Sequence, residues 1–403
     1  MTADNEANIH PLKRIALLFS GGPAPSANAV ISSAALSFLD HGIEVIGMVE
    51  GFSHLESVSS GLVEGQHYLV LDPTISKIRN ERGVYIRSSR ANPGKAIKCQ
   101  ADLSDPKKRE KLKAVVDGLK SLKVDALVTM GGDDTLKTAN FIHLMGMPTI
   151  HVPKTIDNDY FGIAWTFGFW TAVDAAKVPL LTLKADADST NAYFLVEMMG
   201  RKAGWITYAA GLAAEACAMI AAEEIEGDLD LEALASSLAD MIIARDADGR
   251  TAGIICIAEG LADKLPESAK PKEIDQHGNV YFGKAELCKT LADRISAIYK
   301  ERTGRQKKIN PKQIGYETRT AAPIAYDTVL ASMLGYGAYR LASEGKFGHM
   351  VSVRDNFDLV AVPFSELVDP RTLTTKVRMV PSESDFHRLK EALSYPKKMR
   401  PVL

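Results

Sequence analysis

Two short acidic segments are the parts of this sequence best suited to chemistry. Residues 131–135 read GGDDT, and residues 153–159 read PKTIDND. Adjacent carboxylates supply the hard oxygen ligands that Mg²⁺ prefers. A carboxylate close to a lysine can take a proton while the lysine stabilises a phosphoryl group in transfer. One interpretation of the two segments is therefore metal-assisted phosphoryl transfer.

Each segment also has a purely structural interpretation. Asp133 or Asp134 could cap a helix, because an aspartate satisfies free amides at a helix N-terminus and favours the helix dipole. One aspartate suffices for capping, and a second adds repulsion unless a cation is present. Asp157, Asp159 and Lys154 could likewise form a turn with an internal salt bridge. Spacing alone leaves both interpretations open.

The elements around these segments predict that both lie at one edge of a parallel sheet. An apolar run at residues 124–130 leads into the first segment, residues 136–145 have a helical pattern, and residues 148–152 form the next short strand. Open α/β sheets bind their ligands at the carboxyl ends of the strands. We therefore expect the two acidic segments on successive loops at that edge.

Two earlier stretches could bind an anion. Residues 15–19 (IALLF) form a short apolar strand, which runs into a Gly-Gly loop and a helix ending near Leu39. Loop amides and a helix N-terminus suit a phosphate, although Gly-Gly after a strand is often only a tight turn. Residues 79–90 contain four arginines, among them Arg90. They form either a solvated connection or a loop that reaches towards phosphate, whose oxygens match the guanidinium group.

The later sequence predicts a second α/β sheet. Strands at residues 193–198, 216–221 and 252–258 alternate with helical stretches. A chain of 403 residues is also too long for one ordinary core. The predicted fold class is α/β, with two doubly wound, mostly parallel Rossmann-like domains.

The composition excludes several classes of protein. Lys+Arg (48) nearly balance Asp+Glu (50), whereas a general nucleic-acid-binding protein has a basic excess. The four cysteines are widely spaced and contain no C-x-x-C pair, which disfavours a zinc site or a disulfide framework. The polar N-terminal residues are unlike a signal peptide, and no apolar stretch approaches the ~20 residues of a membrane span. We therefore expect a cytoplasmic protein that binds neither nucleic acid nor membrane.

The order of the motifs resembles that of the phosphofructokinase family. The segments GGPAPSAN, SSR, GGDDT, PKTIDND, MGRKAG, EG and GYETR follow one another as they do in that family, over roughly residues 14–345. PKTIDND and MGRKAG, with GGDDT upstream, form a highly specific set. The resemblance implies an active site in the cleft between two domains. It also implies transfer of a phosphoryl group to the 1-hydroxyl of fructose 6-phosphate.

The resemblance also implies roles for individual residues. Asp157 would act as the base that accepts the proton of the sugar hydroxyl, Lys154 would stabilise the transition state, and Asp133 would hold Mg²⁺. The remaining contacts with the substrates would be made by Gly22, Arg90, Thr155, Ile156, Asp159, Met199, Gly200, Arg201, Glu259, Tyr316 and Arg319.

Asp134 is the residue that predicts the phosphoryl donor. ATP-using members of the family typically have glycine at this position, whereas members that use pyrophosphate have aspartate. A carboxylate here would occupy and charge the space that the α-phosphate of a nucleotide needs. The resemblance therefore implies pyrophosphate as donor and a reversible reaction, because the bond broken and the bond formed are similar in energy. An ATP-dependent 6-phosphofructokinase is the main alternative.

Some positions depart from the family pattern. Ala192 and Asn310 stand where many relatives have arginines that bind the sugar phosphate, and Arg305, Lys307 or Lys308 could supply the missing charge. Sedoheptulose 7-phosphate is therefore a possible second acceptor. A non-catalytic regulatory subunit of the same fold is disfavoured, because such a subunit is expected to have lost the base or the arginine of MGR. A sugar-binding protein of two hinged lobes would leave the GGDD carboxylates without a purpose.

The resemblance also predicts the domain organisation. We expect a phosphoryl-donor domain of residues 1–160 plus about 317–347, and a sugar-phosphate domain of about 161–316 plus 348–403. The family usually associates into dimers or tetramers, so a homodimer or homotetramer is expected. The last sixty residues carry no motif that predicts a role.

Overall fold

The computed structural model of the protein describes residues 12–57, 61–270, 286–354 and 356–394. The chain divides into two compact units, and each unit is assembled from separate stretches of sequence. Unit 1 comprises Met1–Thr155, Tyr160–Gly168 and Ala322–Lys376. Unit 2 comprises Ile156–Asp159, Phe169–Ala321 and Val377–Leu403.

Unit 1 is built on a seven-stranded sheet with the strand order β11-β10-β5-β4-β1-β2-β3. The central strands are parallel, and only the two outermost pairings, β2 with β3 and β10 with β11, are antiparallel. In chain order the strands are β1 (Arg14–Phe19), β2 (Glu44–Met48), β3 (Tyr68–Leu71), β4 (Ala126–Gly131), β5 (Thr149–Pro153), β10 (His349–Val353) and β11 (Leu359–Pro363). Every residue of β4 and β5 is buried, as expected for parallel strands that are covered on both faces.

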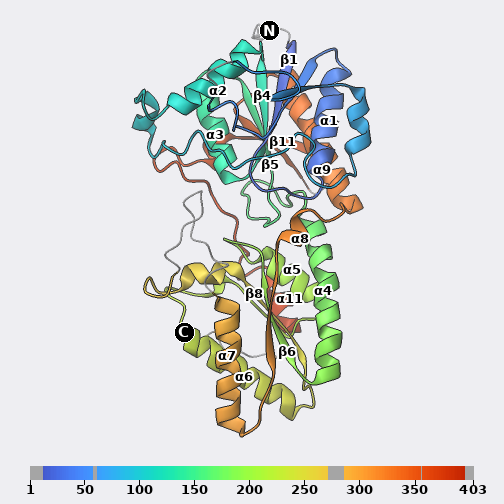
Figure 1. The fold of residues 1–403 in the computed structure, drawn as a ribbon, viewed down its shortest axis with the longest axis vertical. Helices are drawn as coiled ribbons and strands as arrows, with labels where there is room; N and C mark the ends of the chain where they lie inside the picture. Colours follow the sequence, from blue (N-terminus) through green and yellow to red (C-terminus); the bar gives the residue numbers. More distant parts are fainter. Residues whose placement is uncertain (1–11, 58–60, 271–285, 355, 395–403) are drawn as a thin grey trace, which may run out of the picture. The chain divides into compact units, whose positions relative to one another are not determined.

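Helices cover both faces of this sheet, as Figure 1 shows for α1 and α9 on one side and α2 and α3 on the other. Helices α1 and α9 pack closely along each other. The helices of this unit are α1 (Ala27–Leu39), α2 (Glu110–Ser121), α3 (Asp133–Leu144), α9 (Ala325–Ser343) and the short α10 (Phe364–Leu367).

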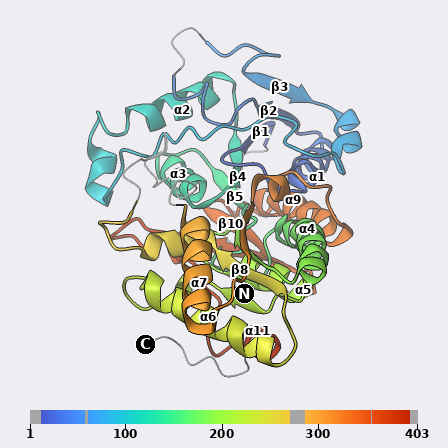
Figure 2. The same cartoon turned by 60° about the horizontal axis from the view of Figure 1, so that its bottom comes forward.

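Unit 2 is built on a four-stranded parallel sheet with the order β7-β8-β6-β9. The strands are β6 (Tyr193–Met198), β7 (Ala218–Ile220), β8 (Gly253–Ala258) and β9 (Ile309–Ile314). The helices are α4 (Phe169–Thr190), α5 (Trp205–Ala213), α6 (Leu231–Ala247), α7 (Leu287–Thr303), α8 (Tyr316–Arg319) and α11 (Asp385–Leu393). Helices α6 and α7 pack against each other, as do α4 and α5 (Figure 2). The predicted fold class, two mostly parallel α/β sheets with their helices, is confirmed.

The structure differs from the expected division into domains at four places, the first of which is Ile156–Asp159, a segment that belongs to unit 2 rather than to the first domain. Residues 348–376 belong to unit 1 rather than to the second domain, because β10 pairs with β5 and β11 pairs with β10. Residues 161–168 also belong to unit 1 rather than to the second domain, and residues 317–321 belong to unit 2 rather than to the first. In the described part of the chain, no helix has both the length and the apolar character needed to cross a membrane.

Candidate active site

The two acidic segments follow neighbouring parallel strands of unit 1. GGDDT begins at the last residue of β4, and PKTIDND begins at the last residue of β5. Strand β4 lies between β1 and β5 in the sheet, so the loop after Phe19 leaves the sheet at the same carboxyl edge. The predicted position of the GGDDT segment and of Lys154 at this edge is confirmed.

Asp133 and Asp134 lie in the first turn of α3 rather than in a loop before it. The helix was predicted from residue 136, but it begins at Asp133, with Gly132 as the preceding cap residue. Carboxylates in the first turn of a helix are stabilised by the helix dipole. The Asp134 side chain is 68% exposed and forms an ion pair of 2.7 Å with Lys137. Asp133 is half-buried.

The Gly-Gly loop after β1 is held against the arginine-bearing loop. The amide of Gly21 donates a hydrogen bond of 2.8 Å to the carbonyl of Ser89, and the Ser88 hydroxyl donates one of 2.6 Å to the carbonyl of Gly21. Gly21 has a φ of +91°, a conformation that a residue with a side chain rarely adopts. These bonds bring Gly22 and the exposed Arg90 into one loop cluster, as the phosphate-binding interpretation requires.

Lys154 joins this cluster from β5. Its backbone amide donates to the carbonyl of Gly131 at 2.9 Å, and its ammonium lies 5.7 Å from the centre of the Phe19 ring. A Cβ atom placed on Gly21 would lie 3.2 Å from the Lys154 Nζ atom, so the lysine ends beside the Gly-Gly loop. The structure therefore gathers the loops of Gly22, Arg90, Asp133 and Lys154 at one sheet edge.

Three buried polar side chains form a connected series of hydrogen bonds next to this edge, and the motifs in the sequence did not predict it. Thr129 Oγ1 lies 2.9 Å from His151 Nδ1, and His151 Nε2 lies 2.9 Å from the Tyr160 hydroxyl. Burial lowers the pKa of His151 to about 3, which keeps the ring neutral at physiological pH. The only available signal was a polar residue inside the apolar strand TIHVP.

The remainder of the PKTIDND segment belongs to unit 2. Thr155 is the last residue of a unit 1 stretch, and Ile156–Asp159 group with the second sheet. Asp157 is half-buried, whereas Asn158 and Asp159 are buried. The single acidic loop expected from the sequence is therefore divided between the two units.

The other predicted residues follow the strands of the second sheet. Met199, Gly200 and Arg201 come directly after β6, Glu259 comes directly after β8, and the helix α8 follows β9. Strand β6 lies between β8 and β9, and all three are parallel, so their carboxyl ends share one edge. The residues predicted to bind the sugar phosphate come from separate motifs, and they therefore lie together in unit 2.

Contacts within this second cluster are specific. The Gly200 amide donates to Glu259 Oε1 at 3.3 Å, and Arg319 Nε lies 3.1 Å from the sulfur of Met199. The Arg319 guanidinium also lies 5.2 Å from the centre of the exposed Tyr316 ring. The cluster thus combines a carboxylate, a guanidinium and an aromatic ring around the turn after β6.

Glu259 is a carboxyl group of this cluster whose ionisation is strongly altered. Burial and, to a smaller extent, the negative charge of Asp157 raise its pKa to about 7, against the lowering effect of the Gly200 amide and of Arg319. A carboxyl group that titrates near neutrality inside a polar site is typical of functional positions. The interaction with Asp157 also places that residue near the Glu259 cluster within unit 2.

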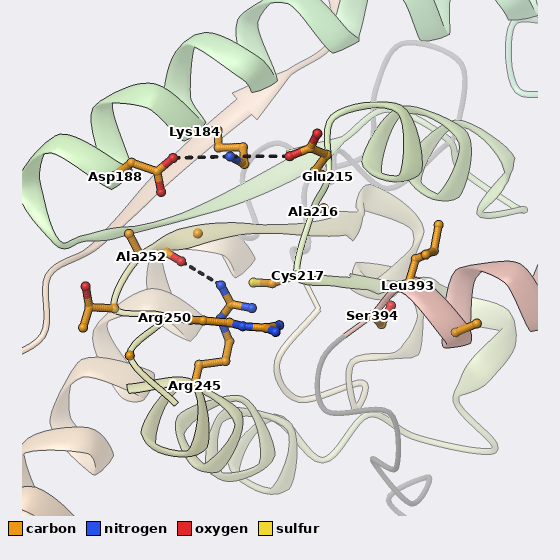
Figure 3. A pocket seen from close by; sticks show the side chains of 14 residues that line it. Lys184, Asp188, Glu215, Ala216, Cys217, Arg245, Arg250, Ala252, Leu393 and Ser394 are labelled. Atoms are coloured by element: carbon orange, nitrogen blue, oxygen red, sulfur yellow. Dashed lines mark hydrogen bonds and ion pairs between the residues drawn. The ribbon is translucent and has the colours of Figure 1, made fainter. Parts of the chain in front are cut away.

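A separate cavity lies at the opposite edge of the second sheet. It has a volume of about 560 Å³ and is lined by residues of α4 and α6 and residues around the starts of β7 and β8, together with the end of α11. Figure 3 shows Lys184 between Asp188 and Glu215, with Nζ–oxygen distances of 3.3 and 3.5 Å. None of the residues predicted from the motifs lines this cavity. The described residues contain no group of three or more His, Cys, Asp or Glu side chains that could hold a metal ion.

The comparisons with known proteins agree with the motifs. A family model described as phosphofructokinase matches residues 14–342. A pyrophosphate–fructose 6-phosphate 1-phosphotransferase of Thermotoga maritima is 37% identical over 395 residues, which cover 94% of this chain and 89% of the relative. The ATP-dependent 6-phosphofructokinase 2 of Streptomyces coelicolor is 33% identical, covering 93% of this chain and 100% of the relative.

Solved structures show the same fold. The crystal structure of a pyrophosphate-dependent phosphofructokinase from Nitrosospira multiformis matches with a TM-score of 0.69 at 19% identity, covering 94% of this chain and 90% of that chain. The match of the family model over most of the chain, together with relatives above 30% identity, establishes the family. This chain belongs to the phosphofructokinase family.

Proposed function

We propose that this enzyme transfers a phosphoryl group from pyrophosphate to the 1-hydroxyl of fructose 6-phosphate, giving fructose 1,6-bisphosphate and phosphate. The observation that carries the choice of donor is Asp134. Its exposed carboxylate lies in the first turn of α3, beside Asp133 and at the sheet edge that holds Lys154. An α-phosphate that reached this helix terminus would meet a second negative charge, whereas the shorter pyrophosphate ends before it.

The donor would be bound by the loop cluster of unit 1. Backbone amides near Gly22 and the guanidinium of Arg90 offer hydrogen-bond donors to phosphate oxygens. Asp133 fits Mg²⁺, because this ion is commonly held by one or two carboxylates together with substrate phosphates. When bound there, Mg²⁺ would neutralise charge on the pyrophosphate oxygens. The Lys154 ammonium would offset the negative charge of the phosphoryl group during transfer.

The acceptor would be bound by the cluster of unit 2. Met199, Gly200 and Arg201 would hold the sugar together with Glu259, and Tyr316 and Arg319 would lie near its phosphate. Thr155, Ile156 and Asp159 would shape the segment that carries the base. Lys307 does not suit the role of a replacement phosphate ligand, because its ammonium forms a buried ion pair of 3.0 Å with Asp246.

In the proposed reaction, the O1 oxygen of the sugar attacks the terminal phosphorus of pyrophosphate. Asp157 accepts the hydroxyl proton as the new O–P bond forms, and the bond to the bridging oxygen breaks, so phosphate leaves. In the reverse direction the same carboxylic acid returns the proton. Glu259 would remain beside Asp157 as a group that is partly protonated at neutral pH.

The second candidate is an ATP-dependent 6-phosphofructokinase, which is favoured by the relatives of that name in Streptomyces coelicolor. A non-catalytic subunit is disfavoured, because Asp157 and Arg201 are both present. We further propose that the enzyme is cytoplasmic, since its proposed substrates are soluble metabolites, and that it assembles as a homodimer or homotetramer like much of its family.

Parallel assays with magnesium pyrophosphate and magnesium ATP test the proposal. Each donor is assayed with fructose 6-phosphate and with sedoheptulose 7-phosphate in turn. The assays are then repeated in the presence of a chelator that removes Mg²⁺. We expect turnover with pyrophosphate, loss of turnover on chelation, and kcat/KM with ATP lower by at least about 100-fold. Turnover with ATP alone would falsify the assignment of the donor.

A double substitution tests whether Asp134 is the cause. Asp134→Gly combined with Lys154→Gly should allow measurable turnover with ATP, because the extra charge and bulk at α3 are removed. Asp117→Gly is a control for a helix carboxylate distant from the site. If the double variant kept full activity with pyrophosphate and gained none with ATP, exclusion at Asp134 would be the wrong explanation.

A further inference from the structure

The C-terminal strap, defined here as residues 377–380, contacts the loop that carries Asp157. The chain leaves unit 1 after Lys376 and returns to unit 2 at Val377. The backbone amide of Arg378 then donates a hydrogen bond of 2.8 Å to the carbonyl of Asp159. Its guanidinium donates one of 2.9 Å to the carbonyl of Asn158. One residue thus binds two consecutive carbonyl groups of the PKTIDND segment.

The strap is itself anchored to the body of unit 2. Trp205 Nε1 donates to the carbonyl of Arg378 at 3.0 Å, and the Arg378 guanidinium lies 4.4 Å from the centre of the Trp205 ring. The Val380 amide donates to Glu223 Oε1 at 3.4 Å, and the same carboxylate accepts the Gly204 amide at 2.9 Å. The strap therefore links the Asp157 loop to the end of the MGRKAG turn.

Helix α11, which follows the strap in the chain, is anchored to the same part of unit 2. Phe386 stacks on Trp205 with ring centres 5.5 Å apart, and Lys390 forms an ion pair of 2.5 Å with Glu224. Glu224 also accepts a hydrogen bond of 2.5 Å from the Tyr208 hydroxyl group. Aromatic and ionic contacts thus hold α11 against Trp205 of α5, the residue that also contacts Arg378, and against Glu224.

The Asp157 loop has an unusual backbone that such contacts would stabilise. Asn158 has a φ of +54°, in the left-handed region, and its side chain is fully buried. Left-handed conformations of residues other than glycine cost free energy and persist where the surroundings enforce them. Burial lowers the pKa of Arg378 to about 10 and the charge of Asp159 opposes that change, so the guanidinium stays charged at neutral pH.

We propose that Arg378 is a positioning residue for phosphoryl transfer, which fixes the Asp157 carboxylate by holding the Asn158 and Asp159 carbonyl groups. The inference rests on the proposed role of Asp157 as base. It assigns a role to the C-terminal segment, which carries no recognisable motif. Arg378 itself acts through the loop and not on the substrate.

The test compares Arg378→Met and Arg378→Lys with the matched control Arg388→Met. Arg388 is an arginine of α11 with a 66% exposed side chain that pairs only with a neighbour on the same helix, Asp385, among the described contacts. We expect kcat of Arg378→Met to fall by about 100-fold, with KM for both substrates changing by less than about threefold. Arg378→Lys keeps the charge and one donor, so its kcat should recover to within about tenfold of the wild type. Arg388→Met should match the wild type.

Other outcomes separate this inference from the proposed function. A wild-type kcat in Arg378→Met, a rise in KM as large as the fall in kcat, or no recovery in the lysine variant would overturn it. If Arg378→Met melts below the assay temperature, Arg378→Gln, which keeps a donor but no charge, carries the same comparison. Asp157→Ser is assayed alongside: if it retains activity, the role of Asp157 fails, whereas an inactive Asp157→Ser with an unaffected Arg378→Met rejects only the positioning role.

Discussion

Lys154 and Asp157 stand three positions apart in the chain, yet they belong to different units. Lys154 is tied to the carbonyl of Gly131 and lies beside the Gly-Gly loop. Asp157 instead lies close enough to Glu259 to alter its ionisation. The boundary between the units therefore falls inside the PKTIDND motif. In the proposed reaction this boundary separates the residue that stabilises the donor from the residue that deprotonates the acceptor.

The raised pKa of Glu259 makes a prediction about stability. Burial and the charge of Asp157 raise this pKa to about 7, so the folded state binds the proton more tightly than the unfolded chain. The contribution of Glu259 to stability is therefore largest below its ordinary pKa and is lost as pH rises towards 7. Glu259→Gln, which retains an acceptor for the Gly200 amide, should raise the Tm at pH 8 and leave it nearly unchanged at pH 4.5. Thermal unfolding at the two pH values measures this.

Glu226→Gln provides the control, because Glu226 is an exposed carboxyl group of the same unit. It should change the Tm at neither pH. Equal stabilisation of Glu259→Gln at both pH values would mean that ionisation is not the cause. Activity should fall in Glu259→Gln in either case, since Glu259 is proposed to bind the sugar.

Residue positions were predictable where a motif directly follows a strand. Lys154, Met199 and Glu259 all lie at the strand ends predicted for them, because an apolar run ends just before each one, whereas Asp133 lies in the first turn of α3 rather than in the predicted loop before it. Arg378 was not predictable in this way. It contacts Asn158 across 220 positions of sequence, and no local pattern encodes such a contact.

The elements bring the motifs together because the strands that carry them are neighbours and parallel. The sequence predicted β6, β7 and β8 from their apolar runs, but it did not predict β9. Strand β9 is at the edge of its sheet, contains Pro311, and exposes three consecutive residues. Proline and polar side chains are tolerated at such an edge, so the usual signal of a strand is absent.

Gly260 shows how tightly two of these strand ends are packed. A Cβ atom at this position would lie 2.3 Å from the carbonyl oxygen of Arg201. The obstacle is backbone, so Gly260→Ala must displace the turn after β6 that carries the proposed sugar contacts. We expect KM for fructose 6-phosphate to rise by about tenfold or more, while KM for pyrophosphate stays within about twofold. Steady-state kinetics with each substrate varied in turn measures the difference.

Gly118→Ala is the matched control for this substitution. An added Cβ there would meet only the ends of the Leu55 and Leu62 side chains, at 3.1 and 3.5 Å, and alanine favours the surrounding helix α2. Its kinetics should equal those of the wild type. Equal changes in both KM values of Gly260→Ala would contradict a local displacement of the sugar-binding turn.

At the scale of the whole molecule, neither unit is a continuous stretch of chain. Unit 1 is completed by α9, β10 and β11, and unit 2 is completed by the strap and α11. Apolar residues at 349–353 and 358–362 are typical of strands, but their pattern does not indicate which sheet the strands join. Pairing of β10 with β5 joins residues about 200 positions apart, and only tertiary contacts specify it.

Two truncations test this interleaved assembly. A chain that ends at Lys376 lacks the strap and α11 but keeps every described element of unit 1, whereas a chain that ends at Ala321 also lacks α9, β10 and β11. Helix α9 packs along α1, where Gly335 approaches the Val30 carbonyl so closely that an added Cβ would lie 2.5 Å from it. Loss of α9 should therefore expose α1 and the strands that it covers.

We expect amide hydrogen exchange to distinguish the two truncated chains. Peptides from β1 and β4 should remain protected in the chain that ends at Lys376, because their hydrogen-bond partners and covering helices are retained. The same peptides should exchange much faster in the chain that ends at Ala321. Peptides from β6 should lose protection in both, since both lack the strap and the contacts of α11 with α5. Equal protection of β1 and β4 in the two chains would show that unit 1 folds without its C-terminal elements, and its assembly from separate stretches would then not be required for its stability.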